Sequence, residues 1–190
     1  MALNSHPVDI WTVPLDASRP LFLSSAEAER AARFRFEKDR THWTRARSAL
    51  REILSSYLSI APENIEFSYG QNGKPATERI EFNLSHARNW ALIAVSHGVP
   101  TGIDLELIRE DVEIGNLLAR IGEPETEGEH RELFHTWTRR EARTKALGAQ
   151  LMQVPPPEVC AVDIKAPEGF AASVALVWRT PVPRYCGGSL

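Results

Sequence analysis

Gly102-Ile103-Asp104-Leu105-Glu106 places two carboxylates one residue apart between apolar residues. In a β-strand, successive side chains point to opposite faces. Asp104 and Glu106 would therefore project to one side, while Ile103 and Leu105 anchor the strand in a core. Two adjacent carboxylates suit a divalent cation such as Mg²⁺, which takes few protein ligands and fills its other positions with water and phosphate oxygens. An ordinary amphipathic strand with a solvated polar face is the alternative that these residues leave open.

Length and composition indicate an ordinary globular protein. Of the 190 residues, 43% are hydrophobic and 25% are charged, which allows a packed core. The formal net charge of −3 gives no basic footprint for nucleic acid, and no apolar run reaches the roughly 20 residues of a membrane span. Residues 1–14 lack the basic flank and apolar segment of a signal peptide. We therefore expect a cytoplasmic protein that binds neither nucleic acid nor membrane.

The two cysteines, Cys160 and Cys186, follow no zinc-ligand spacing. So few cysteines also argue against a disulfide framework, which agrees with a reducing compartment. Cys160 lies in an apolar run, so we expect it to be a small core residue.

Two stretches in the first half of the chain carry helical signals. Between residues 41 and 58, apolar residues recur every three or four positions, which predicts a long amphipathic helix packed on a core. Ser24 and Glu27 have the spacing of a capping box that opens a shorter helix. That helix carries Arg30 and Arg33, which either face solvent or contact a phosphate.

A further helix is predicted from Thr138 to Gly148. Thr138 and Glu141 have capping-box spacing, and Gly148 suits a helix end. Glu141 and Lys145 lie one turn apart on the same face. The pattern alone is equally well explained by a capping residue in an exposed ion pair, worth only about 0.3–0.5 kcal/mol.

Strand signals surround a serine and a histidine. Residues 80–84 predict a strand, and Ser85 and His86 follow it directly. Residues 90–96 form a nearly continuous apolar run, typical of a strand buried on both faces. His86 is then either a hydrogen-bonded surface histidine or a donor to a phosphate or a base.

The order of these elements predicts an α+β fold. Each half of the chain supplies one long helix and several strands in a similar order. This favours a duplicated α+β unit, although no repeat is visible residue by residue. We place the division after residue 88, which gives an N-terminal half of residues 1–88 and a C-terminal half of residues 89–190.

Three stretches stand in order: Phe82-Asn83-Leu84-Ser85-His86, Gly102-Ile103-Asp104-Leu105-Glu106, and Trp137-Thr138-Arg139-Arg140-Glu141-Ala142-Arg143-Thr144-Lys145. Together they resemble the surfactin-type (Sfp-type) 4′-phosphopantetheinyl transferases, and the likeness extends over almost the whole chain. The resemblance implies a monomer built as a pseudo-dimer of two similar α+β halves, with coenzyme A and the active site in the cleft between them. The implied reaction moves the 4′-phosphopantetheine arm of coenzyme A to a serine of an acyl or peptidyl carrier protein. Adenosine 3′,5′-bisphosphate is released.

The resemblance also implies roles for the acidic residues. Asp104, Glu106 and Glu141 fall on the metal ligands of the family, for Mg²⁺ with Mn²⁺ as an alternative. Glu141 is the candidate general base for the carrier serine, directly or through a metal-bound water. Lys145, on the same helix face, would contact the phosphate and the leaving group.

The phosphates of coenzyme A need donors, and the sequence has no Gly-rich phosphate loop to supply them. By the same resemblance, Arg30, Lys74, Ser85 and His86 match positions that contact the nucleotide end of coenzyme A. Arg33 is a neighbouring basic candidate.

Two residues depart from the family pattern. Arg140 stands where the family usually has Lys, which keeps the charge but replaces a compact ammonium with a planar guanidinium. Glu27 stands where a basic residue that contacts the 3′-phosphate is common, so that contact is expected to be weaker.

Two other activities stay open from the sequence. A catalytically silent protein that binds coenzyme A or a nucleotide as a scaffold would not need Asp104, Glu106, Glu141 and Lys145 together. A metal-dependent phosphodiester hydrolase would use the same carboxylates but would need a dedicated group to activate water. The carrier protein and its pathway are not indicated by any stretch of the chain.

Overall fold

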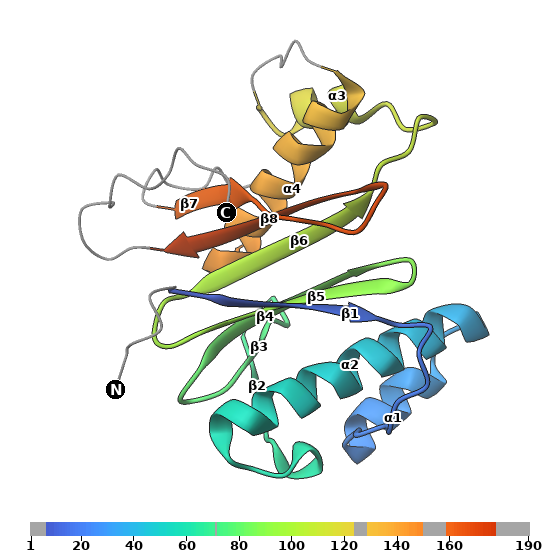
Figure 1. Ribbon diagram of the computed structural model, residues 1–190, viewed down its shortest axis with the longest axis vertical. Helices are drawn as coiled ribbons and strands as arrows, with labels where there is room; N and C mark the ends of the chain where they lie inside the picture. The colour runs from blue at the N-terminus through green and yellow to red at the C-terminus, as the bar shows by residue number, and fades with distance from the viewer. Residues whose placement is uncertain (1–6, 71, 124–128, 150–158, 178–190) are drawn as a thin grey trace.

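The computed structural model of the protein describes residues 7–70, 72–123, 129–149 and 159–177 (Figure 1). Its elements, in chain order, are β1 (Asp9–Pro14), α1 (Ser25–Ala32), α2 (Glu37–Leu58), the 3₁₀ turn η1 (Pro62–Asn64), β2 (Ser68–Tyr69), β3 (Pro75–Ala76), β4 (Glu81–Ala87), β5 (Trp90–Ser96), β6 (Thr101–Leu107), α3 (Ile114–Arg120), α4 (His130–Leu147), β7 (Val159–Asp163) and β8 (Phe170–Val177). The mixture of helices and antiparallel strands confirms the predicted α+β class.

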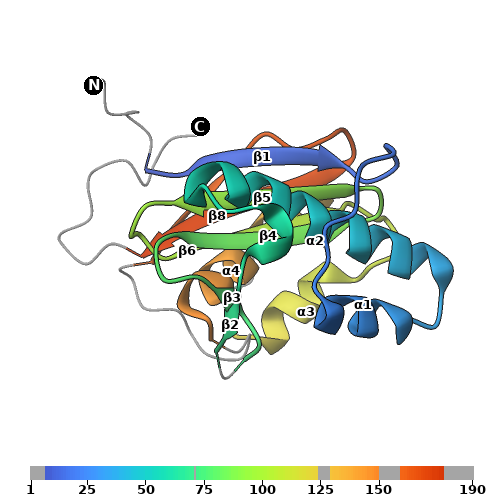
Figure 2. The same ribbon diagram turned by 90° about the horizontal axis from the view of Figure 1, so that it is seen from below.

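The elements stack as helix, sheet, sheet and helix (Figure 1), and Figure 2 looks along this stack with α2 in front of the strands. Helix α2, with α1 beside it, covers one face of the sheet β1–β5–β4, and α4 covers the outer face of the sheet β6–β8–β7. Leu92 and Ala94 of β5 pack between the sheets against Ile103 and Leu105 of β6. Strand β5 is therefore buried on both faces, as its apolar run predicts.

The two larger sheets repeat one connectivity. Along the chain, the first strand of each sheet comes before a long helix, and the other two strands come after it. In space, the last of the three strands lies between the other two, which gives the orders β1–β5–β4 and β6–β8–β7. All of these pairings are antiparallel. Residue 88 lies in the short turn between β4 and β5. The boundary predicted between the two halves of the chain therefore falls between two paired strands. The second run of elements begins later, at β6.

Strand β4 covers the open edge of β6. Among the described residues, β6 pairs in its sheet with β8 alone, so its other edge needs partners for the backbone. Asn83 Oδ1 accepts a hydrogen bond from the Ile103 amide at 2.9 Å, and Ser85 Oγ accepts one from the Leu105 amide at 3.3 Å. These side chains hold the two sheets in register and bring Ser85 beside the acidic face of β6. They also show that Ser85 and His86 lie within β4, not after it as the sequence predicts.

Helix α4 begins earlier than predicted. It starts at His130 with Glu129 as N-cap, so the expected capping box at Thr138 and Glu141 is wrong. Thr138 is a buried interior residue of the helix, and its hydroxyl oxygen lies 3.0 Å from the carbonyl oxygen of His135 in the preceding turn. Leu133 and Phe134 extend the apolar face of the helix onto a cluster with α3, which explains the earlier start.

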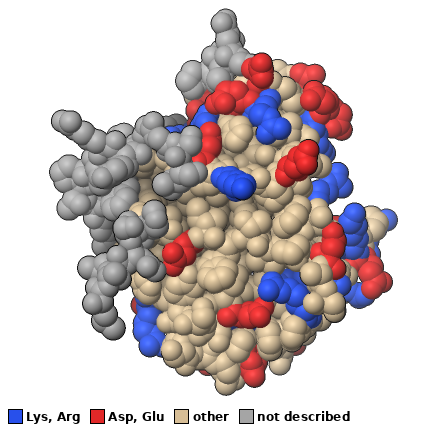
Figure 3. All heavy atoms as spheres, in the orientation of Figure 1, with Lys and Arg blue, Asp and Glu red and all other residues tan. Residues whose placement is uncertain are grey.

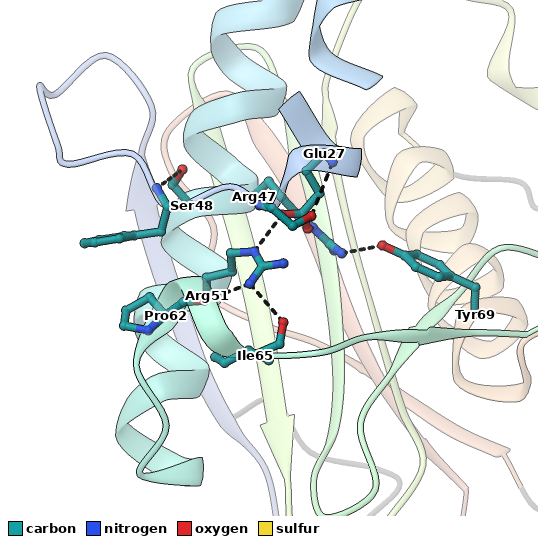
Figure 4. A network of polar contacts seen from close by, with 9 residues as sticks. Glu27, Arg47, Ser48, Arg51, Pro62, Ile65 and Tyr69 are labelled. Atoms are coloured by element: carbon teal, nitrogen blue, oxygen red, sulfur yellow. Dashed lines mark hydrogen bonds and ion pairs between the residues drawn. The ribbon is translucent and has the colours of Figure 1, made fainter. Parts of the chain in front are cut away.

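The capping box predicted at the start of α1 is confirmed, and its glutamate has a second role (Figure 4). The buried carboxylate of Glu27 accepts hydrogen bonds from Arg47 and, at 2.7 Å, from Arg51, both on α2. Arg51 also donates to the carbonyl of Ile65 at 3.0 Å, and Arg47 donates to the Tyr69 hydroxyl at 2.9 Å. Glu27 therefore joins α1 to α2 and to the segment after it.

The surface carries mixed charge. On the face shown in Figure 3, Lys and Arg side chains are interspersed with Asp and Glu side chains. No helix in the described part of the chain is long and apolar enough to cross a membrane. Cys160 is half-buried in β7 and is disulfide-bonded, so the expectation of a small core thiol is wrong. Cys186 lies outside the described residues.

Candidate active site

Asp104 is the most enclosed of the three predicted acids, with 2% of its surface exposed. Its Oδ1 atom accepts a hydrogen bond from Ser85 Oγ at 3.0 Å and forms an ion pair with Lys145 Nζ at 2.5 Å. Lys145 Nζ is also 3.2 Å from Ser85 Oγ, so groups from β4, β6 and α4 converge here. The second oxygen, Oδ2, is buried and has no hydrogen-bond partner among the described residues. A buried carboxylate oxygen is costly without a partner, so Oδ2 is a vacant acceptor for a donor or a cation.

The other two acids share the electrostatic field of Asp104. Burial, followed by the negative charge of Asp104, raises the pKa of Glu106 to about 7, although Lys145 and a hydrogen bond from Trp137 oppose this. Burial also raises the pKa of Glu141, and Asp104 acts in the same direction against the opposing charge of Lys145. The charge of Asp104 therefore makes ionisation of Glu106 and of Glu141 more costly. A cation in this region would relieve that cost.

The donor set matches a hard divalent cation in chemistry, because it consists of carboxylate oxygens, one of them buried and unpartnered. The side chains are not arranged as a ready-made cage: across the described ranges, no three His, Cys, Asp or Glu residues lie together as metal ligands would. Lys145 Nζ, not another acid, is the group closest to Asp104 Oδ1.

Lys145 is a fixed positive charge within this cluster. Burial alone would lower its pKa, but the charge of Asp104 and its hydrogen bond, followed by the charges of Glu141 and Glu106, raise the pKa above the ordinary value. The amine therefore stays protonated at neutral pH and is available to a phosphate.

Gly102 allows α4 to approach β6. A Cβ atom at this position would lie 2.1 Å from the Ala142 carbonyl oxygen and 2.4 Å from the Ala146 nitrogen, closer than such atoms can come. Only glycine therefore lets Glu141 and Lys145 reach the acids of β6. In the sequence, Gly102 stands out only as part of a motif. Its position two residues before Asp104, on the face that α4 covers, is the signal that could have identified it.

Two of the predicted coenzyme contacts lie close to the cluster. Partial desolvation, followed by the positive charges of His42 and Lys145, lowers the pKa of His86, although Asp39 opposes this. Burial lowers the pKa of Lys74, whose Nζ donates to the carbonyl of Thr101 at 3.0 Å, at the start of β6.

The two predicted arginine contacts lie on α1 and at its end. The Arg30 guanidinium lies 5.3 Å from the centre of the Trp43 ring, and Arg33 is the C-cap of α1. Both side chains are exposed, and α1 lies apart from α4 in Figure 1. The structure thus gathers Asp104, Glu106, Glu141, Lys145 and Ser85 with His86 nearby, and leaves the two arginines at a distance from them.

Comparison with known proteins identifies similar chains. Residues 18–98 match the model of the family described as 4′-phosphopantetheinyl transferase, N-terminal. The 4′-phosphopantetheinyl transferase HetI of Nostoc sp. is 36% identical over 169 aligned residues, which cover 78% of this chain and 71% of HetI. The 4′-phosphopantetheinyl transferase gsp of Aneurinibacillus migulanus is 34% identical over 107 residues, which cover 52% of this chain and 45% of gsp.

Proposed function

Because the chain belongs to the 4′-phosphopantetheinyl transferases, we propose that it transfers 4′-phosphopantetheine from coenzyme A to a serine of an acyl or peptidyl carrier protein. The observation that carries the proposal is the convergence of Ser85, Asp104 and Lys145, with Glu106 and Glu141 in the same electrostatic field. Such a cluster combines a protonated donor with carboxylates that can hold a cation, which is what a pyrophosphate substrate requires.

The proposed site lies between the two runs of elements. Ser85 and His86 come from β4, and the three acids and Lys145 come from β6 and α4. We propose that these runs are two similar halves of a monomeric pseudo-dimer, and that coenzyme A binds in the cleft between them. The shared strand order of the two sheets supports this arrangement.

In the proposed reaction, the carrier serine oxygen forms a bond to the phosphorus that bears pantetheine. The bond between that phosphorus and the bridging oxygen of the pyrophosphate breaks, and adenosine 3′,5′-bisphosphate leaves with the electron pair. Glu141 accepts the serine proton; the burial that raises its pKa strengthens it as a base. Lys145 neutralises charge on the phosphate oxygens and on the leaving group.

Asp104, Glu106 and Glu141 would hold Mg²⁺ or Mn²⁺. When bound, the ion would neutralise negative charge on the pyrophosphate. We assign the nucleotide end of coenzyme A to Lys74, Ser85 and His86, with Arg30 and Arg33 reaching its outer phosphate. Glu27 forms ion pairs with Arg47 and Arg51, which neutralise its charge. We therefore assign its carboxylate no contact with coenzyme A.

The proposal is tested by following adenosine 3′,5′-bisphosphate in reactions with coenzyme A and Mg²⁺, with and without an apo carrier protein. Release that requires a carrier with an intact acceptor serine supports the transferase. Release of equal size when that serine is replaced by alanine would indicate hydrolysis instead. Binding of coenzyme A without release on any carrier would indicate a scaffold.

A further inference from the structure

A row of polar residues crosses the sheet beneath α4. Asp104 of β6 pairs directly with Ser173 of β8, and Ser173 pairs directly with Asp163 of β7. Directly opposed residues of antiparallel strands share one face. Asp104, Ser173 and Asp163, which we call the polar row, therefore all lie on the face that α4 covers. Ser173 is completely buried.

Helix α4 contacts each member of the polar row. Lys145 pairs with Asp104 at 2.5 Å, as described above. Thr138 Oγ1 lies 2.8 Å from Ser173 Oγ, and Arg139 donates to Asp163 Oδ2 at 2.7 Å. Ser173 donates its one proton to Asp163 Oδ1 at 2.9 Å, so Thr138 is the donor to Ser173, and two of the contacts form one network.

Beside Gly102, the apolar part of the same interface is built mostly from small residues. Ala142 and Ala146 of α4 pack with Ala175 of β8 and Val159 of β7, and the α4 backbone closely approaches Gly102. Small, smooth side chains bring helix and strand close together but offer few interlocking shapes. Directional hydrogen bonds are better suited to fixing the rotation and the axial position of a helix.

We propose that Thr138, Arg139, Ser173 and Asp163 are positioning residues that set where α4 presents Glu141 and Lys145 over β6. This inference rests on the proposed transferase function. A shift of α4 by one residue would move it by about 1.5 Å and rotate it by about 100°. A misplacement of about 1 Å at reacting groups can cost about 100-fold in rate. The network therefore acts on turnover through Glu141 and Lys145, without contacting the substrate.

The test compares two buried threonines of α4. Thr138→Val removes the hydroxyl bonded to Ser173, which also lies 3.0 Å from the His135 carbonyl. Thr144→Val removes a hydroxyl whose hydrogen bond, among the described residues, stays within the helix, to the Arg140 carbonyl at 3.0 Å. Thr138 and Thr144 are 0% and 4% exposed, so both substitutions bury a similar methyl group. The full chain is assayed for kcat and for KM of coenzyme A with an accepted carrier, and the melting temperature is recorded.

We expect Thr138→Val to lower kcat by about 10- to 100-fold, with KM of coenzyme A changed less than about threefold. Thr138→Ser, which keeps the hydroxyl, should recover most of the activity, and Thr144→Val should stay within about twofold of the unsubstituted protein. If Thr138→Val does not fold, Ser173→Ala replaces it in the test: this change removes the hydroxyl that joins Thr138 to Asp163, and the same loss of kcat is expected.

Equal losses of kcat in Thr138→Val and Thr144→Val would overturn the proposal, as would a fall in melting temperature with kcat retained. Absence of transfer by the unsubstituted chain on every carrier would instead contradict the proposed function.

Discussion

Lys145 Nζ lies 2.5 Å from Asp104 Oδ1, and it is the cation nearest to the most enclosed acid of the site. Its single positive charge faces three carboxylates, those of Asp104, Glu106 and Glu141. Burial, with the negative charge of Asp104 acting in the same direction, raises the pKa of Glu106 and of Glu141. The site is therefore built to receive further positive charge, which accounts for the proposed cation and for the pyrophosphate that it would accompany.

Asp104→Asn should reduce transfer by at least about 100-fold, because it removes the charge of the central acid while keeping its shape. Lys145 is 29% exposed at the side chain, so it can turn toward solvent and the fold should be retained. Circular dichroism and the melting temperature check the fold, and transfer to an accepted carrier checks activity. Full activity in a folded Asp104→Asn protein would contradict the assignment of Asp104.

Lys145→Ala should lower kcat more than it weakens coenzyme A binding, because the ammonium is placed to stabilise charge that grows during the reaction. Calorimetric titration gives the Kd of coenzyme A, and steady-state assays give kcat. The matched control is Lys165→Ala, an exposed lysine outside the site, which should change neither. A loss confined to affinity would reduce Lys145 to a simple phosphate contact.

Gly102→Ala should impair both stability and transfer, because its Cβ would lie 2.1 Å from the Ala142 carbonyl oxygen and push α4 away from β6. The expected loss in the free energy of unfolding is about 1–3 kcal/mol or more. Gly115→Ala is the control: this exposed glycine of α3 has only an ordinary 3.8 Å contact, to Leu133. It should be neutral or stabilising by up to about 1 kcal/mol. Urea unfolding measures both, and a Gly102→Ala protein as stable and active as Gly115→Ala would refute the close approach.

Glu27→Gln should destabilise the protein in a pH-dependent way. Burial would raise the pKa of Glu27, but hydrogen bonds from Arg51, the Ser24 backbone and Arg47, with the charge of Arg47, together lower it below the ordinary 4.5. Its contribution to stability is therefore complete above about pH 4.5 and is lost as the pH falls through the lowered folded-state pKa. We expect a loss of about 3–5 kcal/mol at neutral pH, because two buried arginines lose their partner.

The check on this prediction is the difference in unfolding free energy between Glu27→Gln and the unsubstituted protein, measured from neutral to acid pH. That difference should shrink as the pH falls. Glu29→Gln, an exposed acid on the same helix, should show a small effect with little pH dependence. A difference that grows toward acid pH would show that the ion pair does not carry this stability.

Local patterns in the sequence predicted the parts of the fold that depend on near neighbours. The alternation of residues 102–106 gives the faces of β6, with Ile103 and Leu105 in the core between the sheets. The spacing of Ser24 and Glu27 gives the capping box. Both are decided within a few residues, so they can be read from the chain.

The parts that were missed depend on contacts between distant segments. Thr138 resembles a cap but bonds to Ser173, which is 35 residues away, and the helix begins at His130. The partners of Glu27, Arg47 and Arg51, lie on another helix. No local sequence pattern predicts such pairings. The close approach of the α4 backbone to Gly102 cannot be predicted from a local pattern either.

The most direct measurement of the central claim is the intact mass of apo carrier proteins after incubation with this protein, coenzyme A and Mg²⁺. We predict that at least one carrier gains the mass of one phosphopantetheine group on its acceptor serine, and that EDTA or Asp104→Asn prevents the gain. No mass gain on any carrier in a broad panel, from a folded protein that binds coenzyme A, would contradict the account.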